Sequence, residues 1–544
     1  MPAIQLRHVT KRWGGFYGVD DLSMDIPDNA FVTLLGPSGC GKTTTLRMIA
    51  GLETPTSGQI TIGDQVVYDS DKGIDVPANK RRVGFLFQNY ALWPNMTVYK
   101  NIAFGLANIN EKLPIVDIEA LKASGMARAL AKPDDLKQLL HELRDRKGNV
   151  DPSKALIKLI DTFELPATAA KSVASIAGSD PSVIIADAEK WAKALADIQA
   201  RHKAAGEDLN ERFEIVRNGQ VVTAKRKLSS DEIDLRVRRV SRIVKIGPFM
   251  DRYPSELSGG QQQRVAIART LAPEPTVLFM DEPLSNLDAK LRLEMRSELQ
   301  RLHISTKSTF VYVTHDQMEA MTLATRICLM DNGVLQQYDA PLDVYREPNN
   351  LFVGDFVGNP SINFIDAKGS QKADGTISLK IFDDVPATFR LAEPTDLAQW
   401  HKDQDDQDAK DRAVQDQRLG KRGAVEKENK ESTFRYHIAK MVEEEDLGEE
   451  VETTDADFVL GVRPEFITIS DGGAHPAEVY SSMPTGMETT IRVSVGNFLL
   501  TGVVFGGAVY KIGEKVQISL SGDSVMLFAR SNGRLIGVGS LDIT

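Results

Sequence analysis

The sequence predicts an α/β protein whose C-terminal part is all-β. An apolar stretch at 31–35 leads into a glycine-rich loop, and apolar residues with helical spacing follow at 43–50. A second apolar stretch at 277–280 ends in two acidic residues, at the kind of strand end where open α/β sheets bind ligands. Beyond residue 345, short alternating stretches are separated by turn residues, which indicates a small β-barrel.

The composition is that of a globular chain and restricts its partners. The chain has 544 residues, of which 42% are hydrophobic, and a formal net charge of −11. This length predicts two or three compact units. The acidic balance argues against nucleic acid as a partner, because nucleic acid favours a basic face. Two cysteines, Cys40 and Cys328, cannot build a disulfide framework, which indicates a reducing compartment.

Membrane-spanning and export segments are not expected. No apolar stretch reaches the about 20 residues that are needed to cross a bilayer. The first residues lack the apolar core of a signal peptide.

The N-terminal region is expected to form a small antiparallel sheet. Apolar and polar residues alternate at 4–9 and again at 22–26, before the buried strand at 31–35. The helix predicted after the glycine-rich loop ends at Gly51, a residue typical of helix C-caps.

The glycine-rich loop has a pattern typical of phosphate binding. Residues 36–43 fit G-x-x-x-x-G-K-[S/T], in which backbone N–H groups surround phosphate oxygens at a helix N-terminus. Lys42 is expected near the β- and γ-phosphates, and the Thr43 hydroxyl on Mg²⁺. We interpret Cys40 as a small loop residue, with a redox sensor as the alternative. The residues expected to contact nucleotide are Gly36, Pro37, Ser38, Gly39, Cys40, Gly41, Lys42, Thr43 and Thr44.

The acidic strand end supplies the complementary chemistry. Asp281 is expected as the second anchor of Mg²⁺, usually through water, because it lies at the strand tip. Glu282 is then placed to polarise the attacking water as a general base. ATP hydrolysis chiefly requires positioning of the γ-phosphate and stabilisation of its spreading negative charge.

A further segment carries a family resemblance. Residues 257–264 read Leu-Ser-Gly-Gly-Gln-Gln-Gln-Arg, which resembles the signature sequence of ATP-binding cassette (ABC) ATPases. The other motifs of that family follow in order: Trp13 resembles the adenine-stacking aromatic, Gln88 the Q-loop glutamine, 285–288 the D-loop, and His315 the switch histidine. The resemblance covers about 1–106 and 230–345, and the tail resembles the regulatory domain of maltose-type carbohydrate-importer ATPases.

The resemblance implies roles for these residues. Trp13 would stack on adenine, with a core tryptophan as the alternative. Gln88 would contact Mg²⁺ and the attacking water, and His315 would contact the γ-phosphate. Signature residues cannot reach the nucleotide of their own chain in this family, so a partner chain must supply that phosphate. The expected cross-chain contacts come from Ser258, Gly259 and Gly260. Gln261 and Asp288 are also expected to contact nucleotide. A homodimer suffices, and a pair with a related ABC ATPase remains open.

The resemblance also divides the chain into domains. An ABC-type P-loop NTPase core with a helical subdomain is expected at 1–106 and 229–344. Residues 107–228 would be a mainly helical insertion in that subdomain, and 345–544 an OB-like barrel with a regulatory role. A polar stretch at 399–450 is expected to be flexible or loosely helical.

The insertion has its own predicted elements. Apolar residues recur at a helical period in 184–202, and 213–222 indicates a hairpin on an Asn-Gly turn. Two interpretations stay open: a tolerated surface lobe, and a docking or regulatory module.

The resulting functional hypothesis is an ATP-hydrolysing subunit of an importer for a carbohydrate or polyol. It would work with two transmembrane permeases and, indirectly, a solute-binding protein, at the cytoplasmic face of the inner membrane. One alternative keeps the importer but changes the solute to polyamine, sulfate, iron or glycerol phosphate. A second alternative is a soluble ABC ATPase that acts in translation or DNA repair. The tail could also bind a regulator.

Overall fold

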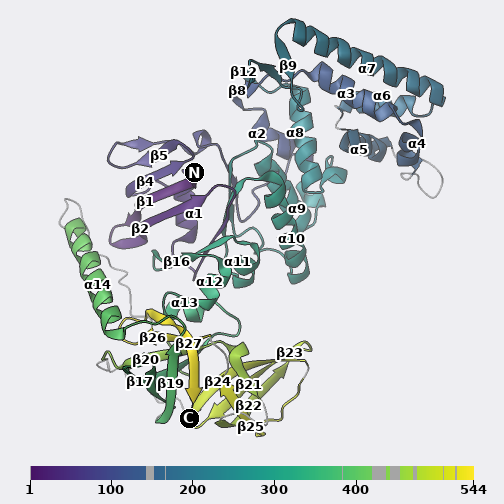
Figure 1. The fold of residues 1–544 in the computed structure, drawn as a ribbon. Coiled ribbons are helices and arrows are strands. Elements are labelled where there is room, and N and C mark those ends of the chain that lie inside the picture. Colours follow the sequence, from purple (N-terminus) through teal and green to yellow (C-terminus); the bar gives the residue numbers. More distant parts are fainter. Residues whose placement is uncertain are drawn as a thin grey trace. The chain divides into compact units, whose positions relative to one another are not determined.

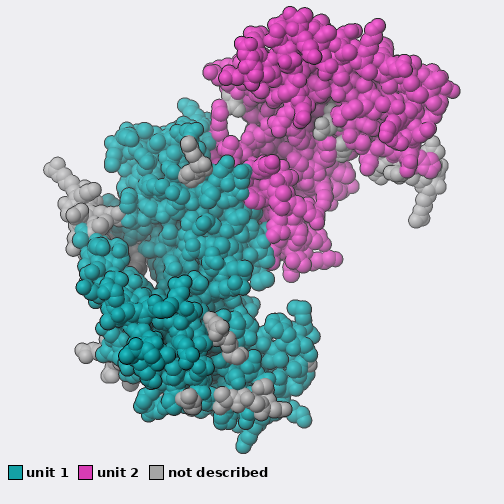
Figure 2. Space-filling model, viewed as in Figure 1, with its two compact units in different colours: residues 1–81, 311–544 teal, residues 82–310 magenta. Residues whose placement is uncertain are grey.

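The computed structural model divides the chain into two compact units. Unit 1 contains residues 1–81 and 311–544, and unit 2 contains residues 82–310 (Figure 2). The described residues are 2–141, 152–163, 165, 167–382, 384–419, 436–441, 454–469, 475–506, 508–520 and 524–543. Within these ranges no helix is both long and apolar enough to cross a membrane.

Unit 1 begins with the predicted antiparallel sheet. Strands β1 (Pro2–Trp13) and β2 (Phe16–Pro27) form a long hairpin, and β4 (Ser57–Ile62) pairs with the other edge of β1. Strands β5 (Gln65–Asp69) and β6 (Ile74–Asp75) complete the order β2-β1-β4-β5-β6. The alternating pattern predicted this sheet correctly.

The parallel part of unit 1 is built around β3 (Phe31–Leu35), all of whose residues are buried. It pairs in parallel with β15 (Arg326–Asp331), which pairs antiparallel with β16 (Val334–Asp339). Helix α1 (Lys42–Ala50) follows the glycine-rich loop and ends at Gly51 in the left-handed conformation, as predicted. A run of five apolar or small residues buried on both faces is typical of such a parallel strand.

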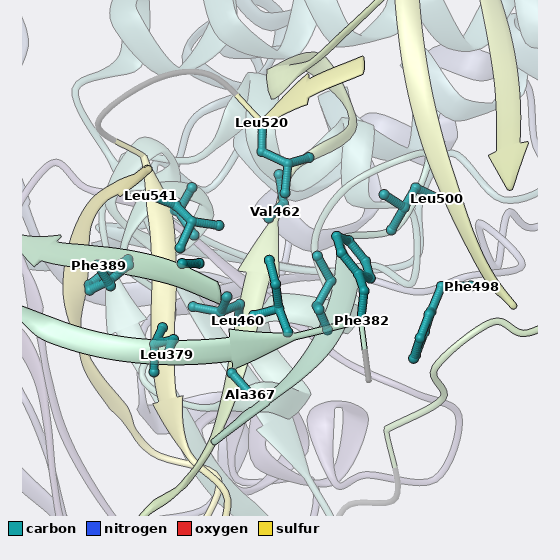
Figure 3. Packing of buried hydrophobic residues seen from close by; sticks show 14 of the residues in the cluster. Ala367, Leu379, Phe382, Phe389, Leu460, Val462, Phe498, Leu500, Leu520 and Leu541 are labelled. Carbon is teal, nitrogen blue, oxygen red and sulfur yellow. The ribbon is translucent and has the colours of Figure 1, made fainter. Parts of the chain in front are cut away.

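The C-terminal part of unit 1 contains the predicted barrel. Its six strands pair antiparallel and close in the order β17 (Asn363–Gln371), β18 (Ile377–Ile381), β19 (Val385–Leu391), β27 (Leu535–Ile543), β26 (Val525–Ala529) and β20 (Asp457–Val462). Figure 3 shows the side chains of Leu379, Phe389, Leu460 and Leu541 among the packed apolar residues of this barrel. Closure leaves no exposed sheet edge and buries this cluster.

A second antiparallel sheet packs against the same apolar cluster. Its order is β21 (Ile467–Ile469), β25 (Lys515–Leu520), β22 (His475–Pro484), β23 (Glu488–Val495) and β24 (Phe498–Phe505). Ile491, Val493 and Leu500 from this sheet are buried in the cluster that also holds Phe389 and Leu460 of the barrel. The barrel and the second sheet therefore share one core.

The polar stretch begins as a helix. Helix α14 spans Leu397–Leu419. The guanidinium of Arg534, in the turn before β27, donates to Gln404 Oε1 and to Asp408 Oδ1 of this helix, each at 2.5 Å. Trp400 packs against the barrel cluster. Residues 420–435 and 442–450 of the predicted loop lie outside the described residues.

Unit 2 contains two parallel strands and a group of helices. Strand β7 (Val83–Leu86) pairs with β13 (Val277–Asp281). Helix α2 (Val98–Leu106) contacts both α8 (Ser230–Ile243) and α9 (Gly259–Leu271). Helix α10 (Ala289–Thr306) follows the acidic strand end.

A helical insertion lobe, residues 110–227, extends from unit 2 on a two-stranded neck. Strands β8 (Asn110–Pro114) and β12 (Thr223–Lys227) pair antiparallel at its two ends. The helices between them lie together at one end of unit 2 in Figure 1; they are α3 (Ile118–Leu130), α4 (Pro133–His141), α5 (Pro152–Phe163), α6 (Ala167–Ile176) and α7 (Pro181–Ala204). The helix predicted at 184–202 is thus confirmed.

The predicted hairpin of the lobe is also present. Strands β10 (Ile215–Arg217) and β11 (Gln220–Val221) pair through Arg217 and Gln220, and β9 (Glu207–Leu209) pairs with the other edge of β10. Asn218 and Gly219 both have positive φ, 52° and 75°, as a two-residue turn of this type requires. The lobe buries its own apolar cluster, which includes Met126, Leu130, Leu159, Val173 and Ile184.

The neck is fixed to helix α8 by a partly buried ion pair. Arg226 of β12 donates to both oxygens of Glu232 at 2.5 and 2.6 Å and to the Pro114 carbonyl of β8 at 2.6 Å. Glu232, only 8% exposed, also accepts from the Ser229 N–H and completes a capping box at the start of α8. Arg226 therefore links the two neck strands, and Glu232 links Arg226 to the helix that follows them.

A histidine bridges three elements inside the lobe. His202 near the end of α7 lies 2.9 Å from Asp117, the N-cap of α3, and 2.9 Å from Glu207 of β9. Arg217 of β10 binds the other oxygen of Glu207 at 2.5 Å. Hydrogen bonds to Asp117 and Glu207 raise the pKa of His202. Bonds from Arg217 and then His202 lower the pKa of Glu207.

We expect the lobe to lose stability as pH rises through the pKa of His202. This pKa is raised in the folded state. The contribution of His202 to folding stability is therefore complete below its pKa in the unfolded chain, about 6.5, and is lost as pH rises through its pKa in the folded chain. Glu207 also stabilises the lobe, but with the opposite pH dependence. Its contribution to stability is lost in acid, as pH falls through its lowered pKa. Calorimetric melting at about pH 6 and about pH 9 measures this loss. His202→Gln cannot titrate, so an equal loss in that variant would contradict the assignment.

Candidate functional site

The phosphate loop connects β3 to α1 in unit 1, which is the strand-loop-helix context that its pattern requires. Gly36 and Gly41 have φ values of 147° and 102°. A Cβ at Gly36 would lie 2.2 Å from the Met330 carbonyl oxygen, and one at Gly41 would lie 2.2 Å from that of Gly18. Both positions need glycine for conformation and for space.

Lys42 lies along the inner side of this loop. Its side chain is nearly buried, and its Nζ donates to the carbonyls of Gly36 at 2.8 Å and Pro37 at 2.7 Å. No acidic residue lies in the first turn of α1. The helix N-terminus and the ammonium group together form a region of positive potential suited to an anion. Thr43 and Thr44 in the same turn are partly exposed, and Ser38 and Gly39 at the loop tip are exposed.

Cys40 is buried in the loop, with 3% of its surface exposed. Burial raises the pKa of its thiol, and the attraction of Lys42 opposes this rise without cancelling it. A thiol held protonated is a weak nucleophile. This environment favours the interpretation of Cys40 as a small packing residue over that of a redox sensor.

We therefore expect the native protein to react slowly with iodoacetamide near neutral pH. Cys328 has no exposed surface, and burial raises its pKa too. Mass spectrometry should find both thiols largely unmodified under conditions that label both in denaturant. Rapid labelling of Cys40 in the folded chain would favour the redox sensor instead.

Trp13 ends β1 at the turn of the hairpin, where it pairs with Phe16. Trp13 is thus the last residue of the strand. The ring is 49% exposed and stacks on Phe16 with centroids 6.5 Å apart, and Lys11 Nζ lies 5.2 Å from its centroid. It is not a core tryptophan, because about half of its surface is exposed.

Gly18 connects Trp13 to the phosphate loop. A Cβ at Gly18 would lie 2.6 Å from the Trp13 ring, so the ring packs directly on this backbone. The Gly18 carbonyl in turn closely approaches Gly41. Sequence reasoning missed Gly18, although a glycine inside a strand is a known signal of close backbone approach.

His315 follows β14 (Thr309–Val313) and precedes helix α11 (Gln317–Leu323). The N–H of Thr314 donates to the carbonyl of Leu34 at 3.3 Å, so this segment lies beside the end of β3 where the phosphate loop begins. The His315 side chain is exposed. Unit 1 thus brings the segment that holds His315 to the strand end that leads into the phosphate loop.

In unit 2, Gln88 and Glu282 are brought together after the ends of β7 and β13. Gln88 Nε2 lies 3.4 Å from Glu282 Oε2, and Asn286 Nδ2 donates to the Gln88 carbonyl at 3.1 Å. Ser285 Oγ donates to the Glu282 carbonyl at 2.9 Å. Glu282 has a φ of 44°, a conformation that is uncommon outside glycine and is often found at functional sites.

Asp281, the last residue of β13, is 6% exposed. Sequence reasoning did not include Asn286 and Ser285 among the site residues. Their position in segment 285–288, which follows the acidic strand end, could have indicated that they lie at the site.

Two of the predicted nucleotide contacts have structural roles in this chain. Asp288 is the N-cap of α10, where its Oδ1 accepts from the Leu291 N–H at 2.9 Å. Gln261 Oε1 accepts from the Ser258 N–H at 2.9 Å, which caps α9. Each side chain therefore stabilises a helix start.

The signature segment forms the N-terminus of α9, as expected. Ser258 is the N-cap, and Ser258 and Gly259 are exposed. Gly260 is buried, and a Cβ there would lie 2.7 Å from a methyl group of Leu291. A helix start of this kind is where anions commonly bind in proteins, through backbone N–H groups. Among the predicted site residues, Trp13, the phosphate loop and His315 belong to unit 1, and the others to unit 2.

The parallel strands and the loop between β3 and α1 define the class of P-loop nucleoside triphosphatases. The family model described as "ABC transporter" matches residues 19–285. The chain belongs to the ABC transporter family, as one of its ATPase subunits.

Curated relatives agree with this membership. The trehalose/maltose import ATP-binding protein of Thermococcus litoralis is 37% identical, over 68% of this chain and 67% of its own length. The xylose/arabinose import ATP-binding protein of Haloferax volcanii is 32% identical, over 98% of this chain and 96% of its own. The sn-glycerol-3-phosphate import ATP-binding protein of Burkholderia pseudomallei is 35% identical, over 68% of this chain and 69% of its own length.

Proposed function

We propose that this chain is the ATPase subunit of an importer for a carbohydrate or polyol. The alignment with the xylose/arabinose import protein carries this proposal, because it extends over 98% of the chain and so includes the C-terminal barrel. An importer for glycerol phosphate is the nearest alternative, given the relative named for it. Polyamine, sulfate and iron remain the more distant alternatives.

The nucleotide-binding domain of this proposal comprises residues 1–106 and 229–344, and the barrel region from 345 would be regulatory. Trp13 would stack on adenine. The phosphate loop would hold the phosphates through its N–H groups, with Lys42 as a cation near the β- and γ-phosphates. Glu282 would accept a proton from the attacking water, and His315 would contact the γ-phosphate.

The residues assigned to Mg²⁺ are Thr43, Gln88 and Asp281. They offer hydroxyl, amide and carboxylate oxygens, which is the donor chemistry that this hard cation prefers. Mg²⁺ would neutralise charge that develops on the phosphates. The contact between Gln88 and Glu282 at 3.4 Å supports a coupled role for these two side chains.

The anion site at the start of α9 supports a dimer. Ser258, Gly259 and Gly260 would bind the γ-phosphate held by a second ATPase chain, arranged head to tail. Closure of this dimer with ATP and its opening after hydrolysis would drive two permease subunits between states. A solute-binding protein would deliver the cargo, and the ATPase would lie at the cytoplasmic face of the inner membrane.

The test is an affinity purification of the tagged Glu282→Gln chain, with ATP, from detergent-solubilised membranes of the native host. This change should slow hydrolysis and retain the closed dimer. Two polytopic permeases and a sugar-type binding protein are the expected co-purifying proteins. Recovery of ribosomes or DNA-repair proteins without a membrane subunit would overturn the transport proposal and favour the soluble alternative.

A further inference from the structure

Helix α11 contains a buried carboxylate just after His315. Glu319 is 3% exposed, and its Oε2 accepts from the Tyr312 hydroxyl at 2.7 Å and from Thr314 Oγ1 at 2.8 Å. Burial of a carboxylate is costly unless its oxygens are hydrogen-bonded. Tyr312 lies in β14, three residues before His315, and Thr314 directly follows the strand, one residue before His315.

The residues on either side of His315 are held by the same network. Thr314 Oγ1, which donates to Glu319, accepts from the Asp316 N–H at 3.0 Å. Asp316 Oδ1 accepts from the Glu319 N–H at 3.1 Å and so caps α11. The Thr314 N–H is bonded to Leu34 of β3. The peptide that carries His315 is therefore fixed at both ends, whereas its imidazole is exposed.

This arrangement differs from ordinary helix capping. In a capping box the side chain at the position of Glu319 would turn back to the N–H of the N-cap residue. Here the N–H of Asp316 is bonded to Thr314 Oγ1, and the Glu319 carboxylate accepts from hydroxyls of the strand. The carboxylate joins the helix to the strand end across the His315 peptide.

We propose that Glu319 is a positioning residue for His315. Through Thr314 and Tyr312 it holds the peptide of His315 beside the end of β3, where the phosphate loop begins. The imidazole then requires little reorganisation to meet the γ-phosphate. A displacement of a catalytic group by about 1 Å can lower the catalytic rate on the order of 10²-fold. This inference rests on the proposed role of His315.

The test compares Thr314→Val and Glu319→Gln, each alone and combined with His315→Ala, in the purified full-length chain. Thr314→Val replaces the bridging hydroxyl with a methyl group of similar size. We expect it to lower kcat for ATP hydrolysis about tenfold or more, with little change in ATP affinity, since ATP binding does not depend on this network. Thr322→Val in the same helix removes an exposed hydroxyl that donates to the Met318 carbonyl and should leave kcat unchanged.

The combined variants separate positioning from general stability. If Glu319 acts through His315, Thr314→Val and Glu319→Gln should have no further effect in the His315→Ala background, because the two effects are coupled. The same fold-loss in both backgrounds, or a loss that follows the melting temperature, would overturn the inference. If His315→Ala itself leaves hydrolysis unchanged, the proposed role of His315 fails first. If His315→Ala is impaired and Thr314→Val is not, only the positioning role fails.

Discussion

Replacement of Glu282 with glutamine is expected to lower kcat for ATP hydrolysis by about 10²- to 10⁴-fold, the usual contribution of a general base. Glutamine has nearly the same shape and still accepts a hydrogen bond from Gln88, which lies 3.4 Å away in the native chain. It cannot accept a proton from water at neutral pH. ATP affinity should therefore remain close to that of the native chain while turnover is lost.

The measurement is steady-state phosphate release together with the dissociation constant for ATP. Glu298→Gln is a matched control in the same unit, because Glu298 is a carboxylate of helix α10 that pairs with Lys245 at 2.6 Å and is not among the site residues. It should retain native kcat. A Glu282→Gln chain that hydrolyses ATP within a few-fold of the native rate would exclude Glu282 as the base.

Motifs made of contiguous residues could be predicted because their geometry is local. The pattern of residues 36–43 already fixes a loop at a helix start, and the apolar run before Asp281 fixes a strand end. The same is true of Ser258 at the start of α9 and of the Asn218-Gly219 turn. For these segments the structure agrees with the sequence, since few distant contacts are needed to form them.

Contacts between distant residues could not be predicted in this way. The packing of Trp13 on Gly18 and of Gly18 on Gly41 depends on how β1 and β2 lie over the loop. The bond from Asn286 to the Gln88 carbonyl joins residues far apart in the chain. Polar residues such as Asp288 and Gln261 are ambiguous in sequence, because the same side chain can cap a helix or contact a ligand.

The all-β part shows a further limit of sequence patterns. Alternation predicted strands beyond residue 345, but it could not separate the closed barrel from the second sheet, since both have the same period. It also did not indicate the buried arginine between them and the preceding helices. That residue is Arg463, which is fully buried.

Arg463 connects the barrel to the segment that precedes it. Its side chain is fully buried and follows β20. The guanidinium donates to the carbonyls of Gly354 at 2.9 Å and Tyr345 at 2.8 Å, and also to that of Val357. It lies 4.1 Å from the centroid of the Tyr345 ring. These acceptors belong to helices α12 (Pro341–Arg346) and α13 (Leu351–Phe356) and to the residue after α13.

Burial lowers the pKa of Arg463 to about 10, so the fold disfavours its charge and yet retains it at neutral pH. The hydrogen bonds to three carbonyls must offset this cost. Their loss would leave buried acceptors without a donor, at about 1 to 3 kcal/mol each, in addition to a cavity. The side chain therefore stabilises the fold chiefly by satisfying the ends of α12 and α13.

We expect Arg463→Ala to lower the free energy of unfolding of unit 1 by about 3 kcal/mol or more. Arg463→Met restores volume but not the donors, so it should be destabilising to a smaller degree. Calorimetric or urea unfolding of the full chain measures the order of the two variants. Arg390→Ala, at an exposed position on β19, should change stability by no more than about 0.5 kcal/mol. If Arg463→Ala were as mild as that control, the three carbonyl bonds would contribute little, and the barrel would be held to α12 and α13 by apolar packing alone.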